Sequence, residues 1–380
     1  ISRHFVNIHP DPSYVTKENS NAELQKEQPN WYGPYLEPGE RYKTERTPEN
    51  VAKACKEMGL DDMSEEKKGE RQFYADLVYR LWVLFDDKLR AIKGVEVDLD
   101  MSDVKPIRFS PYKLSPVKVA AMKALVSEFI ADGIVEPVTS EWGFPALLVP
   151  KPKGGWRLVV DLRKLNELIP HDTYMPPECD LCLEWLQGRP YRTAVDCRWG
   201  FHQVSFSDRA KQVITFVTPF GAFAYRRLVM GYVNASSEFQ RHINNTLGGL
   251  LWKTSLSMVD DVITASKTLE EHRQDVTAVW TKFARRGHSL KPAKVSILKD
   301  DIDYLGHIST PYGLKPTDTH VKAIVDMPPP IDAAGKVDKT RLRSFLGMVK
   351  YSRRYIKRCA QICEPLNFLL TAASMAFGKA

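Results

Sequence analysis

The sequence lacks long hydrophobic runs and contains few cysteines. No stretch of 18 uninterrupted apolar residues occurs in its 380 residues, so we expect no membrane-spanning helix and no membrane partner. Six cysteines in a chain of this length cannot form a disulfide scaffold and are typical of a reducing intracellular compartment. The composition, 43% hydrophobic and 27% charged, is that of a globular protein with two or three domains.

Four of the cysteines form two close pairs. Cys179-x-x-Cys182 and Cys359-x-x-x-Cys363 could in principle supply four thiolates to zinc. The pairs lie far apart in the sequence, and no histidine cluster accompanies them. We therefore expect free thiols.

Charge is distributed unevenly along the chain. Residues 1–100 carry 15 Lys or Arg against 20 Asp or Glu, whereas residues 101–380, here called the body, carry 39 against 27. The positive charge behind the net charge of +7 therefore lies in the body. A basic body predicts a polyanionic partner such as nucleic acid, although charge alone indicates only non-specific binding. The acidic first hundred residues are expected to lie away from that partner or to compete with it.

Hydrophobic periodicity alternates between helix and strand. Residues 1–50 show little periodicity and are predicted to form an extended arm. Ser115 as N-cap, Pro116 at the first position and Gly133 after the last turn mark the ends of one helix. The other expected elements are helices within 47–93 and at 236–247 and 342–359, strands at 191–195 and 213–217, and a hairpin of strands 144–149 and 156–160 around a basic tip at 151–155. Strands interleaved with helices predict an α/β or α+β fold.

Three aspartates are the strongest chemical signal. Asp260 and Asp261 interrupt an apolar run, which predicts that they lie at a hairpin tip between two short strands. Asp196 ends another short β-type run. Three carboxylates at strand ends could hold two divalent ions for phosphoryl transfer, whereas an ordinary exposed turn is the alternative for the Asp-Asp pair.

Several motifs, in order, resemble the reverse transcriptases of long-terminal-repeat retrotransposons, particularly the Ty3/gypsy-like group. The likeness covers roughly residues 104–370, and its matching stretches are 106–108, 115–116, 133–137, WRLVVDLRKLN at 156–166, 195–196, GFHQ at 200–203, TPFG at 218–221, 234–235, 239–240, VDD at 259–261, LGH at 305–307, GLKP at 313–316 and LRSFLG at 342–347. The resemblance implies an α+β right-hand polymerase fold. Its expected parts are an acidic N-terminal extension (1–100), fingers and the start of the palm (101–190), palm (191–316) and a helical thumb (317–380), without protease or RNase H domains.

The resemblance also implies roles for individual residues. Asp196 matches the motif A metal ligand, and Asp260 with Asp261 matches the motif C pair, which together would bind two Mg²⁺ ions. Phe201 matches the aromatic residue that excludes a 2′-hydroxyl, although a core aromatic is the alternative interpretation. The other positions expected to contact the incoming deoxynucleoside triphosphate are Arg157, Lys151, Lys153, Met230, Gly231 and Lys294.

Two further segments are expected to bind the primer-template. Leu305, Gly306 and His307 match the primer grip. The basic residues of the predicted thumb helix are Lys350, Arg353, Arg354 and Lys357. Composition alone also allows a merely solvated basic face for this helix.

Departures from the family pattern leave two hypotheses open. Met258 replaces the usual aromatic of motif C, and Val229–Ser236 lacks both prolines and the aromatic residue of motif B. In the first hypothesis the chain is an RNA-directed DNA polymerase that uses Mg²⁺ and deoxynucleoside triphosphates, in the cytoplasm or nucleus. In the second, a host has retained the fold as a non-catalytic, metal-free RNA-binding subunit of a ribonucleoprotein, such as a ribosome, with ribosomal RNA and neighbouring proteins as partners. An organelle such as the mitochondrion then becomes an alternative location.

Overall fold

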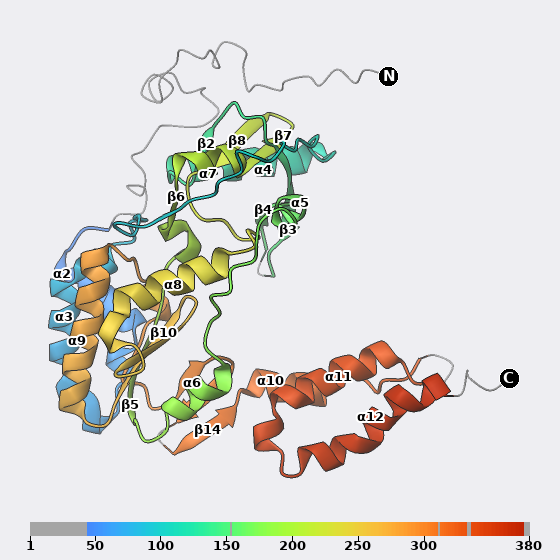
Figure 1. Ribbon diagram of the computed structural model, residues 1–380. Coiled ribbons are helices and arrows are strands. Elements are labelled where there is room, and N and C mark those ends of the chain that lie inside the picture. Colours follow the sequence, from blue (N-terminus) through green and yellow to red (C-terminus); the bar gives the residue numbers. More distant parts are fainter. Residues whose placement is uncertain (1–43, 153, 311, 333–335, 376–380) are drawn as a thin grey trace, which may run out of the picture. The chain divides into compact units, whose positions relative to one another are not determined.

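A computed structural model describes residues 44–152, 154–310, 312–332 and 336–375, with side chains up to residue 371. Most of the predicted N-terminal arm, and Lys153 at the basic tip, lie outside the described residues. The chain divides into two compact units. The first contains the described residues up to Glu178 together with Tyr191–Lys299, and the second contains Cys179–Pro190 together with residues from Asp300 onward (Figure 1).

Short helices begin the first unit. They are α2 (Pro48–Glu57), α3 (Arg71–Arg80) and the 3₁₀ helices η4 (Leu60–Asp62), η5 (Glu65–Glu70) and η6 (Trp82–Leu84). Thr47 caps α2 by accepting a hydrogen bond from the backbone N–H of Asn50, and Pro48 occupies the first helical position, where its missing N–H costs nothing. The guanidinium of Arg273 on α9 (Leu269–Arg286) lies over the ring of Phe73 on α3.

A five-stranded sheet with the order β2-β8-β7-β3-β4 follows. Its strands are β2 (Val135–Pro137), β3 (Phe144–Pro150), β4 (Trp156–Val160), β7 (Thr215–Thr218) and β8 (Gly221–Tyr225). Helices α4 (Pro116–Ala131), α5 (Arg163–Asn166) and α7 (Asp208–Val213) and the short parallel pair β1 (Glu96–Val97) and β6 (Ser205–Phe206) complete this part. The predicted helix after Ser115 and the β3–β4 hairpin are confirmed.

The strand predicted at 213–217 begins later than expected. Val213 is the last residue of α7, which Ser207 caps through its side-chain oxygen, and β7 begins at Thr215. Val213 is β-branched and would by itself favour a strand. The Ser207 cap instead stabilises the helix, because it satisfies the N–H of Ala210 at the helix start.

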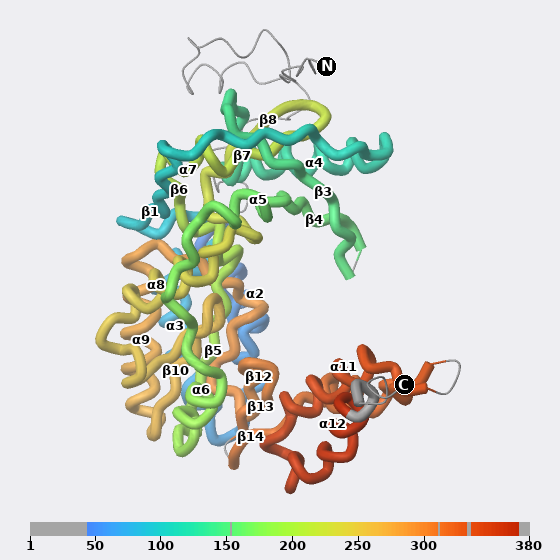
Figure 2. Tube along the Cα trace, turned by 45° about the vertical axis from the view of Figure 1, so that its right-hand side comes forward, coloured from blue at the N-terminus to red at the C-terminus, as the bar shows by residue number. Residues whose placement is uncertain are grey.

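A four-stranded antiparallel sheet with the order β11-β5-β10-β9 carries the predicted aspartates. Its strands are β5 (Tyr191–Asp196), β9 (Ser255–Met258), β10 (Asp261–Ser266) and β11 (Ser296–Ile297). Helices α8 (Ala235–Leu247) and α9 pack against each other and against this sheet (Figure 2). Short 3₁₀ helices η7 (Gly200–Gln203), η8 (Gly248–Leu250) and η9 (Pro292–Lys294) connect the elements.

The second unit combines a small sheet with helices. It contains α6 (Cys179–Trp185), the strands β12 (Ile302–Tyr304), β13 (His307–Thr310) and β14 (Gly313–Pro316), and the helices α10 (Asp318–Val325), α11 (Lys339–Tyr351), η10 (Arg353–Tyr355) and α12 (Cys359–Met375). The prediction of one continuous helix over 342–359 is wrong. Arg358 has a left-handed φ of 58°, which an α-helix cannot continue through, so α12 begins only at Cys359.

Both units are α+β, as the sequence predicts. Within the part of the chain that the structure describes, no helix is long and apolar enough to span a membrane.

Candidate active site

Strand pairing brings the predicted aspartates together. Asp196 is the last residue of β5 and Asp261 the first of β10, and the antiparallel register places these two residues directly opposite each other. Asp260 lies in the two-residue turn between β9 and β10, and its carbonyl accepts a hydrogen bond from the N–H of Cys197 at 3.2 Å. The prediction of a hairpin with both aspartates at its tip is confirmed.

The β9–β10 turn has an unfavourable backbone conformation that a buried side chain supports. Val259 has a φ of 54°, a region that β-branched residues rarely adopt. Gln240 on α8 is fully buried, and its Oε1 accepts a hydrogen bond from the N–H of Val259 at 2.6 Å. Its Nε2 donates to the Ser257 hydroxyl at 2.8 Å and to Asn244 Oδ1 at 2.9 Å. A sheet-facing network therefore holds the turn that carries Asp260.

Asp196 lies in a partly buried and electrostatically mixed environment. Burial raises the pKa of its carboxyl group, the Lys294 ammonium lowers it, and the nearby Asp260 carboxylate raises it again. The Nζ atom of Lys294 lies 2.5 Å from Asp196 Oδ2. A cation from η9 thus already balances the charge of this carboxylate.

A pocket of about 430 Å³ opens beside Asp196 and Asp260. Three other residues predicted from the sequence, namely Phe201, Met230 and Lys294, also line it. Asp261 is exposed and is not among the lining residues. The remaining lining residues, which the sequence analysis did not identify as candidates, are Cys197, Arg198, Trp199, Gly200, His202 and Lys291. Lys291 lies three residues before Lys294, and that helical spacing of two lysines is the signal that could have identified it.

The donor types at this site, but not their spacing in the structure, suit a hard divalent cation. Carboxylate oxygens are the ligands that Mg²⁺ prefers, and the strand register supplies Asp196 and Asp261 from opposite strands with Asp260 in the adjoining turn. Within the described ranges, no three acidic, His or Cys side chains lie close enough together to form a metal centre. Because Lys294 pairs with Asp196, a cation bound to this carboxylate would have to compete with the Lys294 ammonium.

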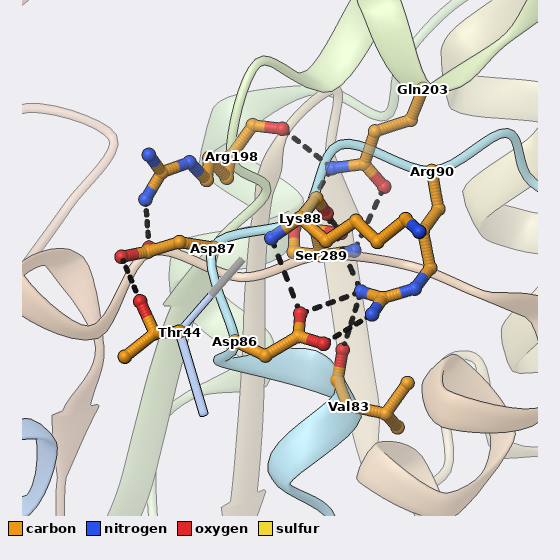
Figure 3. Close-up of polar contacts among 9 residues, drawn as sticks. All are labelled: Thr44, Val83, Asp86, Asp87, Lys88, Arg90, Arg198, Gln203 and Ser289. Atoms are coloured by element: carbon orange, nitrogen blue, oxygen red, sulfur yellow. Dashed lines mark hydrogen bonds and ion pairs between the residues drawn. The ribbon is translucent and has the colours of Figure 1, made fainter. Parts of the chain in front are cut away.

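Hydrogen bonds and an ion pair connect the segment after Asp196 to loop residues of the N-terminal segment. Figure 3 shows Arg198 donating to the Asp87 carboxylate, which also accepts from the Thr44 hydroxyl. Gln203 bridges the same region, because its Nε2 donates to the Arg198 carbonyl at 2.6 Å and to the Ser289 carbonyl at 2.8 Å. These contacts place Arg198 at the pocket with much of its charge already paired.

None of the residues between 44 and 100 lines the pocket beside Asp196 and Asp260. The described part of the acidic segment therefore does not line this pocket. One of its ion pairs joins Asp87 to Arg198, which lies two residues after the end of β5.

Other predicted nucleotide contacts lie outside this pocket. Arg157 on β4 pairs with Val149 on β3, and its side chain is exposed, as is that of Lys151 at the hairpin tip. Gly231 has a φ of 93° in the loop before α8. Asn166 holds that loop, because its Nδ2 donates to the Gly231 carbonyl at 2.8 Å and its Oδ1 accepts from the N–H of Val233 at 3.0 Å.

The predicted primer grip forms the turn between β12 and β13 in the second unit. Leu305 and Gly306 have φ values of 52° and 70°, and the hydroxyl of Tyr351 donates to the Leu305 carbonyl at 2.5 Å. His307 is 4% exposed, stacks on Tyr351 and shares a 2.7 Å hydrogen bond with the hydroxyl of Tyr355. The turn is therefore anchored to α11 and η10, and the imidazole of His307 is part of that anchor.

The predicted basic residues of the second unit are all exposed at the end of α11 and beyond. Lys350 and Lys357 face solvent, whereas Arg353 and Arg354 both pair with Asp180 on α6. One carboxylate thus offsets part of the positive charge of this segment.

Comparisons with known proteins identify the family. Residues 149–309 match the family model described as reverse transcriptase (RNA-dependent DNA polymerase). The retrovirus-related Pol polyproteins of transposons 297 and gypsy from Drosophila melanogaster are each 32% identical to the chain, over 86% and 67% of its length. The chain spans 32% and 24% of these two relatives, that is, about a third or less of their length.

Solved structures agree on the fold. The foamy viral protease-reverse transcriptase dRH in complex with double-stranded DNA superimposes with a TM-score of 0.76 at 21% identity, over 93% of this chain and 59% of that one. The foamy viral protease-reverse transcriptase in complex with an RNA/DNA hybrid gives a TM-score of 0.73 at 20% identity, over 92% and 45%. The right-hand polymerase fold expected from the sequence is confirmed. The chain therefore carries a reverse transcriptase domain of the type found in the Pol polyproteins of Ty3/gypsy-like long-terminal-repeat retrotransposons.

Proposed function

We propose that this chain is an RNA-directed DNA polymerase that extends a primer on an RNA template with deoxynucleoside triphosphates. The observation that carries the proposal is the strand register that places Asp196 opposite Asp261, with Asp260 in the adjoining turn. Asp196 and Asp260 line a pocket that is large enough for part of a nucleotide. Because this arrangement occurs in a reverse transcriptase domain, nucleotidyl transfer is the activity that it favours.

Asp196, Asp260 and Asp261 would hold two Mg²⁺ ions. Such ions lower the pKa of an attacking hydroxyl and stabilise the charge on the leaving phosphate oxygens. The chain supplies the donors from two strands and one turn, and Gln240 fixes that turn. Lys294 keeps Asp196 charge-balanced, and with Lys291 it presents positive charge to an entering triphosphate.

Phe201 is proposed to select deoxynucleotides. Its ring lies at the pocket and packs edge-on against Phe239 on α8, with ring centroids 5.7 Å apart. Phe239 is fully buried, so it holds the Phe201 ring in one orientation. A rigid ring at this position leaves no room for a 2′-hydroxyl, whereas a deoxyribose would fit.

The proposed partners are RNA and an RNA/DNA primer-template. Two observations support them: the basic residues 101–380 and the structural neighbours described as complexes with double-stranded DNA and with an RNA/DNA hybrid. Contacts through phosphate and sugar suffice for this role, because the template supplies the sequence information. Exposed Lys350 and Lys357 are candidates for such contacts.

The test is primer extension on an RNA template in the presence of Mg²⁺, with the whole chain. Asp260→Asn is expected to reduce extension by about 100-fold or more, because one metal-binding carboxylate contributes several kcal/mol of charge stabilisation. Asp103→Asn makes the same chemical change at an exposed position of the same unit and is expected to leave extension unchanged. Extension by the unaltered chain that Asp260→Asn does not reduce would contradict the proposal.

The same preparation distinguishes the non-catalytic hypothesis. A chain that retains tight, salt-dependent RNA binding but shows no extension with any divalent cation would be an RNA-binding subunit and not a polymerase. The pairing of Lys294 with Asp196 is the observation that motivates this control, since it satisfies the carboxylate without a metal ion.

A further inference from the structure

Two cysteines face each other at the start of α12. The Sγ atoms of Cys359 and Cys363 are 3.9 Å apart, and both side chains are half-buried, so a small molecule can reach them. Residues four positions apart lie on the same face of a helix, which explains the juxtaposition. Neither thiol has a role in the proposed polymerase chemistry, so the pair needs its own explanation.

Cys359 lies at the start of a helix and next to basic residues. Cys359 is the first residue of α12, and the dipole of a helix favours negative charge near its N-terminus. Lys357 and Arg358 directly precede it, and both are exposed. Positive charge and a helix N-terminus are the two features that make a cysteine reactive, because the thiolate is the nucleophile.

We propose that Cys359 and Cys363 form a redox-sensitive dithiol that hydrogen peroxide oxidises to a disulfide. The Cys359 thiolate attacks a peroxide oxygen, so an S–O bond forms, the O–O bond breaks and hydroxide leaves. The Cys363 sulfur then attacks the Cys359 sulfur, so the S–S bond forms, the S–O bond breaks and water leaves with the Cys363 proton. Overall, the two thiols lose two hydrogen atoms and one peroxide becomes two water molecules.

The two thiols are suited to different steps. Burial raises the pKa of the Cys363 thiol, and its hydrogen bond with Cys359 raises that pKa further. In the proposed sequence Cys363 is the sulfur that attacks second, in the thiol–disulfide exchange step. By contrast, Cys55 and Cys182 are buried, and burial raises the pKa of each to about 11, so they should be inert.

Disulfide formation would distort the first turn of α12. A disulfide needs Cβ atoms about 3.5–4.5 Å apart, whereas helical positions four residues apart hold them about 5–6 Å apart. Pro365 lies in the next turn and has no N–H to donate to the carbonyl of Gln361, so this end of the helix has one hydrogen bond fewer to lose. The bond should therefore form at the expense of local helix and be readily reduced.

Peptide mass spectrometry after graded peroxide treatment of the whole chain tests the proposal. A tryptic peptide that begins at Cys359 contains both thiols and no other cysteine. We expect this peptide to lose the mass of two hydrogen atoms and to resist alkylation, and dithiothreitol to restore both thiols. Cys363→Ser should stop the reaction at the Cys359 sulfenic acid, which dimedone labels.

The exposed Cys179 serves as an internal control for reactivity. If Cys359 and Cys363 remain fully open to alkylation at a peroxide dose that already oxidises Cys179, the proposal is wrong. It is equally wrong if dimedone labels Cys359 to the same extent with and without Cys363, because the second thiol would then have no part in the reaction.

Discussion

Gln240 offers a direct test of how the β9–β10 turn, which carries Asp260, is held. We consider Gln240→Leu, which keeps a side chain of similar size but removes all of its hydrogen-bonding groups. The N–H of Val259 loses its acceptor, and the Ser257 hydroxyl and Asn244 Oδ1 lose a donor. The change is confined to a site with 0% exposure, so water cannot replace these partners.

The expected loss of stability follows from that list of groups. A buried N–H without an acceptor costs about 1–3 kcal/mol, and each additional lost hydrogen bond about 0.5–1.5 kcal/mol. We therefore expect Gln240→Leu to lower the free energy of unfolding by about 2–6 kcal/mol. Since the φ of 54° at Val259 is unfavourable, the turn should also relax and move Asp260, so extension should fall even where the chain remains folded.

Guanidinium unfolding monitored by tryptophan fluorescence measures the first effect. Trp82, Trp142 and Trp280 are buried in the unit that contains Gln240 and report its unfolding. The midpoint should fall while the slope stays constant. Gln274→Leu on α9 is the matched control, because Gln274 is exposed and its change should cost less than about 0.5 kcal/mol.

Two results would refute this reasoning. If Gln240→Leu unfolds within about 0.5 kcal/mol of the unaltered chain, the buried hydrogen bonds do not support the turn. If it is destabilised as expected but extends primers at the unaltered rate below the transition, the network contributes to stability without positioning Asp260. Primer extension and unfolding must therefore be measured on the same preparations.

Three further predictions concern Asp196, Gly306 and Phe201. Burial raises the pKa of Asp196 in the folded state, so the ionised carboxylate disfavours folding. The contribution of this group to the free energy of unfolding is therefore present at low pH and is lost as the pH rises through the raised pKa. Asp196→Asn should therefore unfold at higher denaturant than the unaltered chain at pH 7, and the difference in midpoint should vanish as the pH falls to the ordinary aspartate range. Gly306→Ala should destabilise the second unit by about 1–3 kcal/mol in circular dichroism melts, because φ is 70° and the new Cβ would lie 2.3 Å from the Tyr351 hydroxyl oxygen. Phe201→Ala should raise incorporation of ribonucleotides relative to deoxynucleotides at least about 10-fold in single-nucleotide extension, which a purely structural role would not do.

Local signals predicted much of the fold. The β3–β4 hairpin was predictable because Lys151–Gly155 concentrates turn-forming residues between two β-type runs. The break between α11 and α12 was not, since the apolar and basic spacing continues across residues 352–358. The left-handed φ of Arg358 depends on how the chain is held by the surrounding structure, and no local residue preference indicates it.

The site was predictable in its parts but not in its assembly. Asp-Asp between apolar runs indicates a hairpin tip, which is a local property. The pairing of Asp196 with Asp261 joins residues far apart in the sequence, and spacing carries no information about register. Arg198 was not identified for a similar reason: its place at the pocket depends on Asp87, a residue over a hundred positions earlier.

The acidic N-terminal segment shows what the uneven charge distribution means structurally. Glu70 pairs with Arg273, Asp87 with Arg198, and Asp98 with Arg209, so carboxylates of the first hundred residues meet arginines of the basic body. These pairs are distributed over α9, the segment after β5 and the start of α7. Exposed pairs contribute little stability singly, but the buried carboxylate of Glu70 would carry an uncompensated charge without Arg273. The segment therefore uses part of the positive charge of residues 101–380 to fix its own position, and only the remaining cations would be available to the proposed nucleic-acid partner.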